Sequence, residues 1–282
     1  YRFWAVDEML AVVEWMRTYN ATRGDRPALQ IAGADVYDGV GAAQEVLRYL
    51  RAVDPLAAAE AEAEYSCVSS LPSPACRDHA RIVLDRLTAK RAEYESIAGA
   101  PAFVEARQSA TVVMQANATF GERDGNMATN VEWLLANRSA ARRIIFWAHQ
   151  EHVGKTQTPF VGGLPSGAYL DERLGSRYVA IGSMTGGGSY RYWRSNPFGE
   201  PATAIVPPPA SGTYESFFRL REAAALLIPL NGEAVPAWLA GPAHHFVVGT
   251  SASDQLTLVS LPAKLDAVVY IEFSSPTQPL TR

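Results

Sequence analysis

In this chain of 282 residues, helix-like segments dominate the first half and strand-like segments the second. This distribution constrains the fold more than any other feature. Before residue 140, apolar residues recur at the three- and four-residue spacing of amphipathic helices. After it, short β-branched and aromatic runs alternate with turns that contain Gly and Pro, which indicates strands. Strands separated by helices predict an α/β fold with a mainly parallel central sheet flanked by helices.

The pattern predicts helices over residues 8–19, 41–52, 57–65, 78–97, 101–118 and 124–136. It predicts strands over residues 29–32, 144–148, 179–181, 204–206, 224–228, 246–248, 256–259 and 267–273. We find no internal repeat and no low-complexity linker. We therefore expect one α/β domain over residues 1–282, in which the helical block 40–120 is an insert that caps the cleft.

Composition and charge exclude several classes of protein. The net charge is -4 and no run is rich in Lys or Arg, which argues against a nucleic-acid partner. No apolar stretch reaches the roughly 18 residues that a membrane-spanning helix needs. The first residues, Tyr1 to Trp4, do not form a signal peptide and lead directly into a helix, so we expect upstream residues to be absent. The sequence does not indicate an oligomeric state.

The two cysteines, Cys67 and Cys76, lie in one loop that is rich in Ser and Pro. A loop this short favours a disulfide, which would stabilise the fold by roughly 2–3 kcal/mol on the chain-entropy account. The alternative is two unpaired thiols. A disulfide favours an exported protein, periplasmic or secreted, over a cytoplasmic one.

The most chemically informative segment is residues 142–152, which read RRIIFWAHQEH. Its apolar run Ile144–Ala148 predicts a strand that ends at His149 and His152, and ligands bind at the carboxyl ends of strands in open α/β sheets. An imidazole titrates near neutral pH, which suits general acid–base cleavage of an ester or lactone. The alternative is that both histidines only bond backbone carbonyls at the strand end.

Arg123 and Asp124 begin the predicted helix 124–136. An aspartate in the first turn is favoured by the helix dipole, so Asp124 could be a cap alone. The dipole does not favour arginine there, which suggests that Arg123 binds a carboxylate or phosphate or stabilises an oxyanion. Asp35 follows the strand predicted over 29–32 and either lines the site or caps the next helix. We expect these residues and the two histidines to converge on one cleft.

Other motifs narrow the chemistry further. The aromatic residues Tyr190, Tyr192 and Trp193 either line an apolar pocket or belong to the core. The sequence contains no G-x-S-x-G nucleophile elbow, phosphate-binding loop or dinucleotide fingerprint, so we predict direct activation of water and no cofactor. We predict no metal site, because H-x-x-H lacks the helical HExxH context and a clear third ligand.

These motifs also carry a resemblance. The order R-D-x-x-M-x-x-N from Arg123 to Asn130, followed by W-A-H-x-x-H from Trp147 to His152, is similar to the erythromycin esterase family. Further segments resemble the family in the same order: 15–20, 31–35, 167–170, 178–182 and 265–270. The resemblance implies an esterase with Arg123, Asp35 and the histidines at its site. Gln150 stands where the family usually has Asn, and the family's N-terminal third, with a G-E-x-x-H-G motif and a further Glu, has no counterpart here.

We therefore predict a hydrolase that cleaves an ester or lactone, such as a macrolide ring, through histidine-activated water. His149 is the predicted acid–base group, His152 its support and Arg123 the oxyanion or substrate clamp. The predicted substrate-binding residues are Asp35, Asp124, Tyr190 and Trp193. The family's proposed base falls in the third without a counterpart, so we expect residues 1–282 alone to be catalytically incomplete. The alternatives are a haem- or metal-binding α/β protein and an inactive family member linked to polysaccharide biosynthesis.

Overall fold

A computed structural model describes residues 4–69, 72–138, 143–194, 200–231, 235–248 and 255–280. The chain divides into two compact units. The α/β unit comprises Tyr1–Ala32, Ser139–Gln157 and Gly167–Arg282. The helical unit comprises Gly33–Arg138 and Thr158–Ser166, and it contains the whole predicted helical insert, residues 40–120. The role of this insert as a cap over the cleft stays a prediction.

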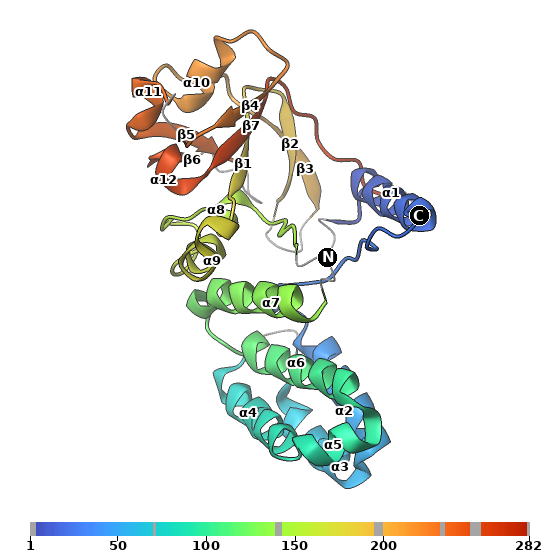
Figure 1. The fold of residues 1–282 in the computed structure, drawn as a ribbon. Coiled ribbons are helices and arrows are strands. Elements are labelled where there is room, and N and C mark those ends of the chain that lie inside the picture. Colours follow the sequence, from blue (N-terminus) through green and yellow to red (C-terminus); the bar gives the residue numbers. More distant parts are fainter. Residues whose placement is uncertain are drawn as a thin grey trace. The chain divides into compact units, whose positions relative to one another are not determined.

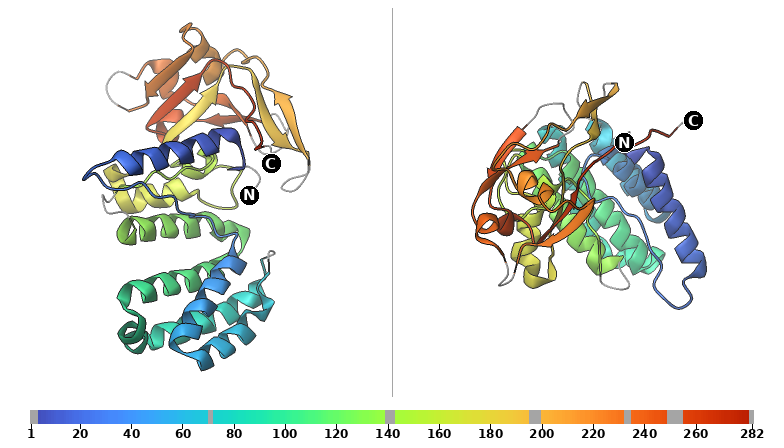
Figure 2. Two further views of the ribbon diagram at one scale, coloured as in Figure 1. Left: turned by 90° about the vertical axis from the view of Figure 1, so that its right-hand side faces the viewer. Right: turned by 90° about the horizontal axis from the view of Figure 1, so that it is seen from above.

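The helical unit is built from α-helices and short 3₁₀ turns (Figures 1 and 2). They are α2 (Gly39–Val53), α3 (Pro55–Glu64), η2 (Tyr65–Cys67), α4 (Pro74–Ala89), α5 (Arg91–Ala98), α6 (Ala100–Ala116), η3 (Phe120–Glu122) and α7 (Arg123–Asn137). The helix predicted over 78–97 is two helices, because the backbone at Lys90 (φ -93°, ψ 16°) leaves the helical conformation between α4 and α5. The side chain of Lys90 forms an ion pair of 2.6 Å with Asp54 at the start of α3.

Local sequence explains where these helices begin. Proline occupies the first turn of α3, α4 and α6, where its missing N–H costs no hydrogen bond. Asp38 caps α2 and Asp54 caps α3 by accepting backbone hydrogen bonds from Gly41 and Ala57. The apolar faces of α2, α4 and α6 then pack into one core, whose fully buried members include Val46, Ala80, Phe103 and Val113.

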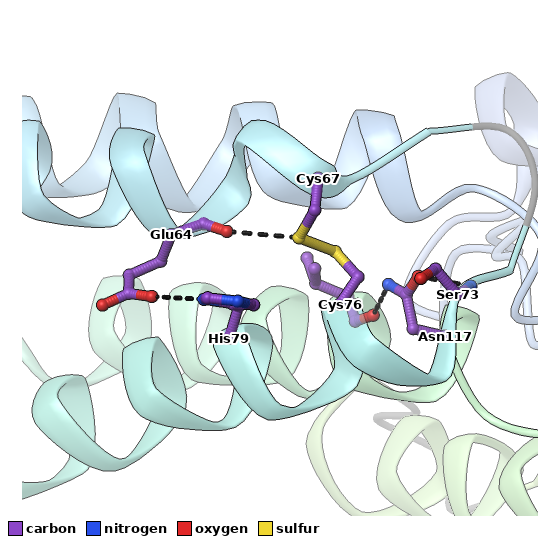
Figure 3. The surroundings of a disulfide bond; sticks show 7 residues. Glu64, Cys67, Ser73, Cys76, His79 and Asn117 are labelled. Atoms are coloured by element: carbon purple, nitrogen blue, oxygen red, sulfur yellow. Dashed lines mark hydrogen bonds and ion pairs between the residues drawn. A yellow bond between two sulfur atoms is a disulfide. The ribbon is translucent and has the colours of Figure 1, made fainter.

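The predicted disulfide is present (Figure 3). Cys67 and Cys76 are bonded, with their Cα atoms 5.6 Å apart, and the bond joins η2 to the first turn of α4. Two further contacts hold the same region: His79 lies 2.7 Å from a carboxylate oxygen of Glu64, and the backbone N–H of Ser73 donates to the side chain of Asn117 at 3.1 Å.

The α/β unit contains one long helix, α1, several short helices and short strands (Figure 1). The helices are α1 (Asp7–Thr22), α8 (Gln150–Val153), α9 (Ser166–Leu174), η4 (Gly175–Arg177), α10 (Tyr214–Arg219), α11 (Ala237–Ala240) and α12 (Leu261–Lys264). The strands are β1 (Ile181–Thr185), β2 (Ser189–Trp193), β3 (Pro201–Ile205), β4 (Ala225–Pro229), β5 (Ala243–Val247), β6 (Gln255–Val259) and β7 (Ala267–Ile271). Across the described residues, no helix is long and apolar enough to cross a membrane.

In the described part of the chain, three small sheets replace the predicted parallel sheet. One has the order β1-β7-β4, and the others are the pairs β2-β3 and β5-β6. Within the described strands only β1 and β7 run parallel; β4 is antiparallel to β7, and both two-stranded sheets are antiparallel. The α/β class is therefore confirmed and the mainly parallel sheet was wrong. An apolar run predicts a strand but not its direction, which depends on how the chain returns to the sheet.

Side chains alternate across the three-stranded sheet. Met184, Val268 and Tyr270 are buried on one face, where they pack with Phe218 of α10 and with Leu261 of α12. Residues on the opposite face remain open to solvent: Ile181, Leu227 and Ile271. This period of two is the ordinary consequence of the pleat, and it places α10 and α12 against the buried face.

Two predicted strands do not form. No described strand pairs with Ile144–Ala148, and the side chains of Ile145 and Trp147 are 93% and 62% exposed. Trp147 instead meets Trp4 edge-on, with ring centroids 5.6 Å apart. Leu29–Ala32 also has no partner among the described strands, and Asn20 of α1 bonds both the N–H and the carbonyl of Leu29. A strand requires a neighbour to satisfy its backbone, and the apolar pattern alone does not supply one.

Candidate functional site

His149 lies immediately before α8, and this short helix lies at one end of β1 (Figure 1). The Nδ1 of His149 accepts a hydrogen bond of 3.2 Å from the backbone N–H of Glu151, so the imidazole caps its own helix. Its Nε2 lies 2.6 Å from the carbonyl oxygen of Val248, which can only accept. Nε2 therefore carries the proton and Nδ1 the lone pair, which makes His149 a neutral imidazole with a defined tautomer.

Partial desolvation of the imidazole is the main reason why the pKa of His149 is lowered from its ordinary value. The charges of His152 and Lys264 lower the pKa of His149 further, while the carbonyl of Val248 and the carboxylate of Glu151 oppose the shift. A lowered pKa keeps the ring neutral at pH 7, which is the protonation state that a general base needs.

The side chain of Glu151, in α8, is buried. Its carboxylate forms an ion pair of 2.5 Å with the ammonium group of Lys264 in α12, and both side chains are only 2% exposed. Gln150–Val153 is a turn of helix, which directs the side chain of Glu151 into the protein.

Further contacts hold the residues that follow. The hydroxyl of Tyr178 donates to the carbonyl of Val153 at 2.6 Å. Lys155 binds Asp266 at 2.9 Å and Asp171 at 3.0 Å. The histidine segment, residues 149–155, is thus attached to α9, α12 and the start of β7, although it does not belong to a sheet. His152 is half-buried within it.

Arg123 and Asp35 meet in the helical unit. The guanidinium donates from Nε at 3.0 Å and from Nη2 at 2.6 Å to the two carboxylate oxygens of Asp35. It also lies 4.6 Å from the ring centroid of Tyr37. Burial disfavours the charge of Arg123, but the hydrogen bond and charge of Asp35 outweigh it, so the pKa of Arg123 is raised. The sequence predicted both residues at the site, but it did not predict that they pair.

Asp124 and Asn130, from the same motif, are both buried in α7. The backbone N–H and the hydroxyl of Ser166 each donate to Oδ1 of Asp124 at 2.9 Å. The side-chain amide of Asn130 donates to the carbonyl of Ala34 at 3.0 Å, which fixes the residue next to Asp35. Asp124 therefore anchors a loop in this structure, and its predicted contact with substrate stays a prediction.

The remaining candidates lie in the α/β unit. Tyr190 and Trp193 of β2 are 8% and 6% exposed, which fits the core interpretation better than an open pocket wall. Within the described ranges, no group of three or more His, Cys, Asp or Glu side chains is arranged to hold a metal ion. His149 belongs to the α/β unit and Arg123 to the helical unit. Their convergence on one cleft stays a prediction.

Two residues near the histidine segment had no signal of their own in the sequence. Lys264 lies 113 residues from Glu151 along the chain. His245 of β5 is fully buried, and its burial, together with the charge of Lys264, holds its pKa well below the ordinary value. The alternation of β5 explains why only the second ring of the adjacent pair His244-His245 faces inward.

Known proteins resemble this chain in sequence. The sequence pattern of the erythromycin esterase family matches residues 1–274. A curated relative from Bacillus subtilis, named "Putative hydrolase YbfO", is 24% identical over 168 residues. That match spans 56% of this chain but only 36% of the relative.

Solved structures share the fold. A Bacillus cereus protein superposes with a TM-score of 0.85 at 20% identity, over 98% of this chain and 74% of its own. A succinoglycan biosynthesis protein gives 0.80 at 20% identity, over 98% and 73%. A mutant of the erythromycin esterase EreC in its open conformation gives 0.69 at 16% identity, over 96% and 74%. The fold is thus that of known erythromycin esterase-like proteins, and the match over residues 1–274 shows that this chain belongs to the erythromycin esterase family.

Proposed function

We propose that this protein is a carboxylic-ester hydrolase that cleaves an ester or lactone by water activated at the histidine segment. The observation that carries the proposal is His149, which is neutral, has a defined tautomer and is oriented by backbone groups on both sides. Family membership supports the same reaction class. A macrolide ring is one candidate substrate, and the sequence pattern does not distinguish it from other esters.

In the proposed reaction, His149 exchanges the proton between water and the leaving alcohol. The only lone pair on the neutral ring is at Nδ1, where the bond from Glu151 is 3.2 Å long and therefore weak. Substrate and water must compete with that N–H, so a small movement of the ring is part of the proposal. Catalytic hydrogen bonds are often loose in a free enzyme and tighten in its complex with substrate.

Arg123 is proposed to stabilise the oxyanion, and His152 to support His149. The guanidinium donates to Asp35 from Nε and Nη2, so the pairing orients the group. Asp35, Asp124, Tyr190 and Trp193 complete the proposed substrate-binding set.

The test is hydrolysis of p-nitrophenyl esters and of a macrolactone by wild type, His149→Ala and Arg123→Ala. Each variant should lose about 10²–10⁴-fold in kcat, the usual contribution of one acid–base or oxyanion group. His244→Ala is the matched control, because His244 is exposed on β5 and should leave turnover unchanged. If both variants keep wild-type turnover on a substrate that the protein hydrolyses, the assignment is wrong.

A family member without hydrolytic activity, linked to polysaccharide assembly, is the second candidate. The observation in its favour is that both nitrogens of His149 are engaged by the backbone and that Arg123 is bonded to Asp35. One structural relative is a succinoglycan biosynthesis protein. Absence of turnover by wild type on every ester and lactone, together with binding of an acidic polysaccharide, would favour this candidate.

A further inference from the structure

The ion pair between Lys264 and Glu151 is almost completely buried. The two side chains meet at 2.5 Å and are 2% exposed. Removing two charges from water is costly, and such a pair often adds little to stability compared with well-packed apolar side chains. Its position therefore calls for a role other than stability alone.

The path of Lys264 is shaped by Gly154, which follows α8 directly. A Cβ at Gly154 would lie 2.9 Å from both Cγ and Cε of Lys264, and 3.1 Å from the carbonyl oxygen of Gln150. The backbone N–H of Lys155 also donates to the carbonyl of Lys264 at 2.9 Å. The aliphatic part of Lys264 thus lies against the end of α8, and its ammonium group reaches the carboxylate of Glu151 within that helix.

His149 is exposed to charges of both signs from the elements around it. Glu151 and His152 belong to α8, Lys264 to α12, and the buried ring of His245 to β5. Glu151 favours a protonated His149, whereas Lys264 disfavours it. When two opposite unit charges are in contact, their electrostatic effects on a third group largely cancel. The charges of Glu151 and Lys264 therefore act on the imidazole of His149 as a pair.

We propose that Lys264 is a positioning residue for His149: it fixes α8 through Glu151, and its charge cancels that of Glu151 at the imidazole. The catalytic consequence rests on the proposed function, whereas the positioning itself does not. The contact joins residues 113 positions apart, and it acts on a segment that has no strand partner among the described residues. The ion pair thus holds the histidine segment in place, as hydrogen bonds to a neighbouring strand hold a strand in a sheet.

The experiment is an NMR titration of the imidazole of His149 in the full chain with labelled histidine, assigned with His149→Asn. In Lys264→Met the titration midpoint should rise by about half a pH unit or more, because a nearby cation is lost. In Glu151→Gln it should fall by a similar amount, and the double variant should return toward wild type. Lys264→Arg, which retains the charge, should restore the wild-type midpoint.

Lys155→Met is the matched control. Lys155 also lies beside α8 and binds Asp266 and Asp171, but it is not among the groups that act on His149. It should leave the midpoint unchanged. If Lys155→Met, Lys264→Met and Glu151→Gln all lower thermal stability and none moves the midpoint, the pair is only structural and the inference fails. If Lys264→Met does not fold, the titration midpoints of His149 in Glu151→Gln and Lys264→Arg test the inference instead.

Activity measurements separate this inference from the proposed function. If both hold, the acidic limb of the pH–rate profile moves in the same direction as the NMR midpoint in each variant. A moving midpoint without any ester or lactone cleavage would retain the positioning role and remove the proposed function. A moving pH–rate limb with a fixed midpoint would assign the proton transfer to a group other than His149 and overturn the role of Lys264.

Discussion

Arg123 and Asp35 form a two-point ion pair in the helical unit, although 88 residues separate them along the chain. The guanidinium side chain is 16% exposed and that of Asp35 35%, so the pair is only partly screened by solvent. Paired parallel N–H···O bonds fix the plane of a guanidinium as well as its position. Asp35 therefore fixes the orientation of the Arg123 guanidinium.

This pairing predicts the effect of Asp35→Asn. The amide keeps one acceptor but loses the charge and the second acceptor, so the guanidinium is less well oriented. We expect kcat/KM for ester cleavage to fall by roughly tenfold. A hydrogen bond to a charged group contributes about 1.5–3 kcal/mol, and the amide should retain part of that contribution. Glu62→Gln, which alters the exposed pair with Arg51, is the control and should leave kcat/KM unchanged. Wild-type kinetics in Asp35→Asn would contradict a role for Asp35 at the site.

Gly167, in the first turn of α9, packs against the backbone that follows the histidines. A Cβ there would lie 2.0 Å from the carbonyl oxygen of Val153 and 2.5 Å from that of Gly154. Backbone atoms cannot move aside cheaply, so Gly167→Ala should destabilise the fold by about 1–3 kcal/mol or more. Urea unfolding measures the change. Gly241→Ala is the control, since its Cβ would meet nothing within 4 Å and its φ of -89° suits alanine; equal stability of the two variants would refute the close approach.

The buried carboxyl of Glu215 should make the free energy of unfolding depend on pH. Burial raises its pKa to about 7, although the N–H of Phe246 bonds one carboxylate oxygen. Between about pH 4.5 and pH 7 the folded state holds a proton that the unfolded state has released, so this group makes stability fall as pH rises through that window. Glu215→Gln removes the effect and should be more stable than wild type at pH 8, by up to roughly 3 kcal/mol, but not at pH 4.

The measurement for Glu215 is the free energy of unfolding in urea at the two pH values. Glu172→Gln, on the exposed face of α9, is the control and should follow wild type at both. A Glu215→Gln variant with the same offset from wild type at pH 4 and pH 8 would show that the carboxyl does not titrate in this window.

The Cys67–Cys76 bond predicts a stability difference between oxidised and reduced protein. Closing a loop of this length should stabilise the fold by about 2–3 kcal/mol on the chain-entropy account. Unfolding in urea with and without dithiothreitol measures the difference, and the double variant Cys67→Ser/Cys76→Ser should behave as the reduced protein under both conditions. Two reactive thiols per chain after denaturation without reductant would show that the bond is absent in the native protein.

The sequence alone was sufficient for most helices of the helical unit. The stripe of Met127, Val131 and Leu134 is buried in α7 as its spacing predicts, because a period of 3.6 places such residues on one face whatever lies opposite. The motif residues Arg123 and His149 and the disulfide were likewise recognisable, since each depends on residues that are close in sequence.

The tertiary structure decided what depends on distant partners. Ile144–Ala148 has the composition of a strand, yet no described strand lies beside it, because a ladder requires a second backbone that local composition does not specify. Lys264 reads in the sequence as an ordinary surface lysine, and only the packing of α12 against α8 buries it beside Glu151. Local periodicity determines which face of an element is apolar, whereas pairings across a hundred residues are determined by the energy of the folded whole.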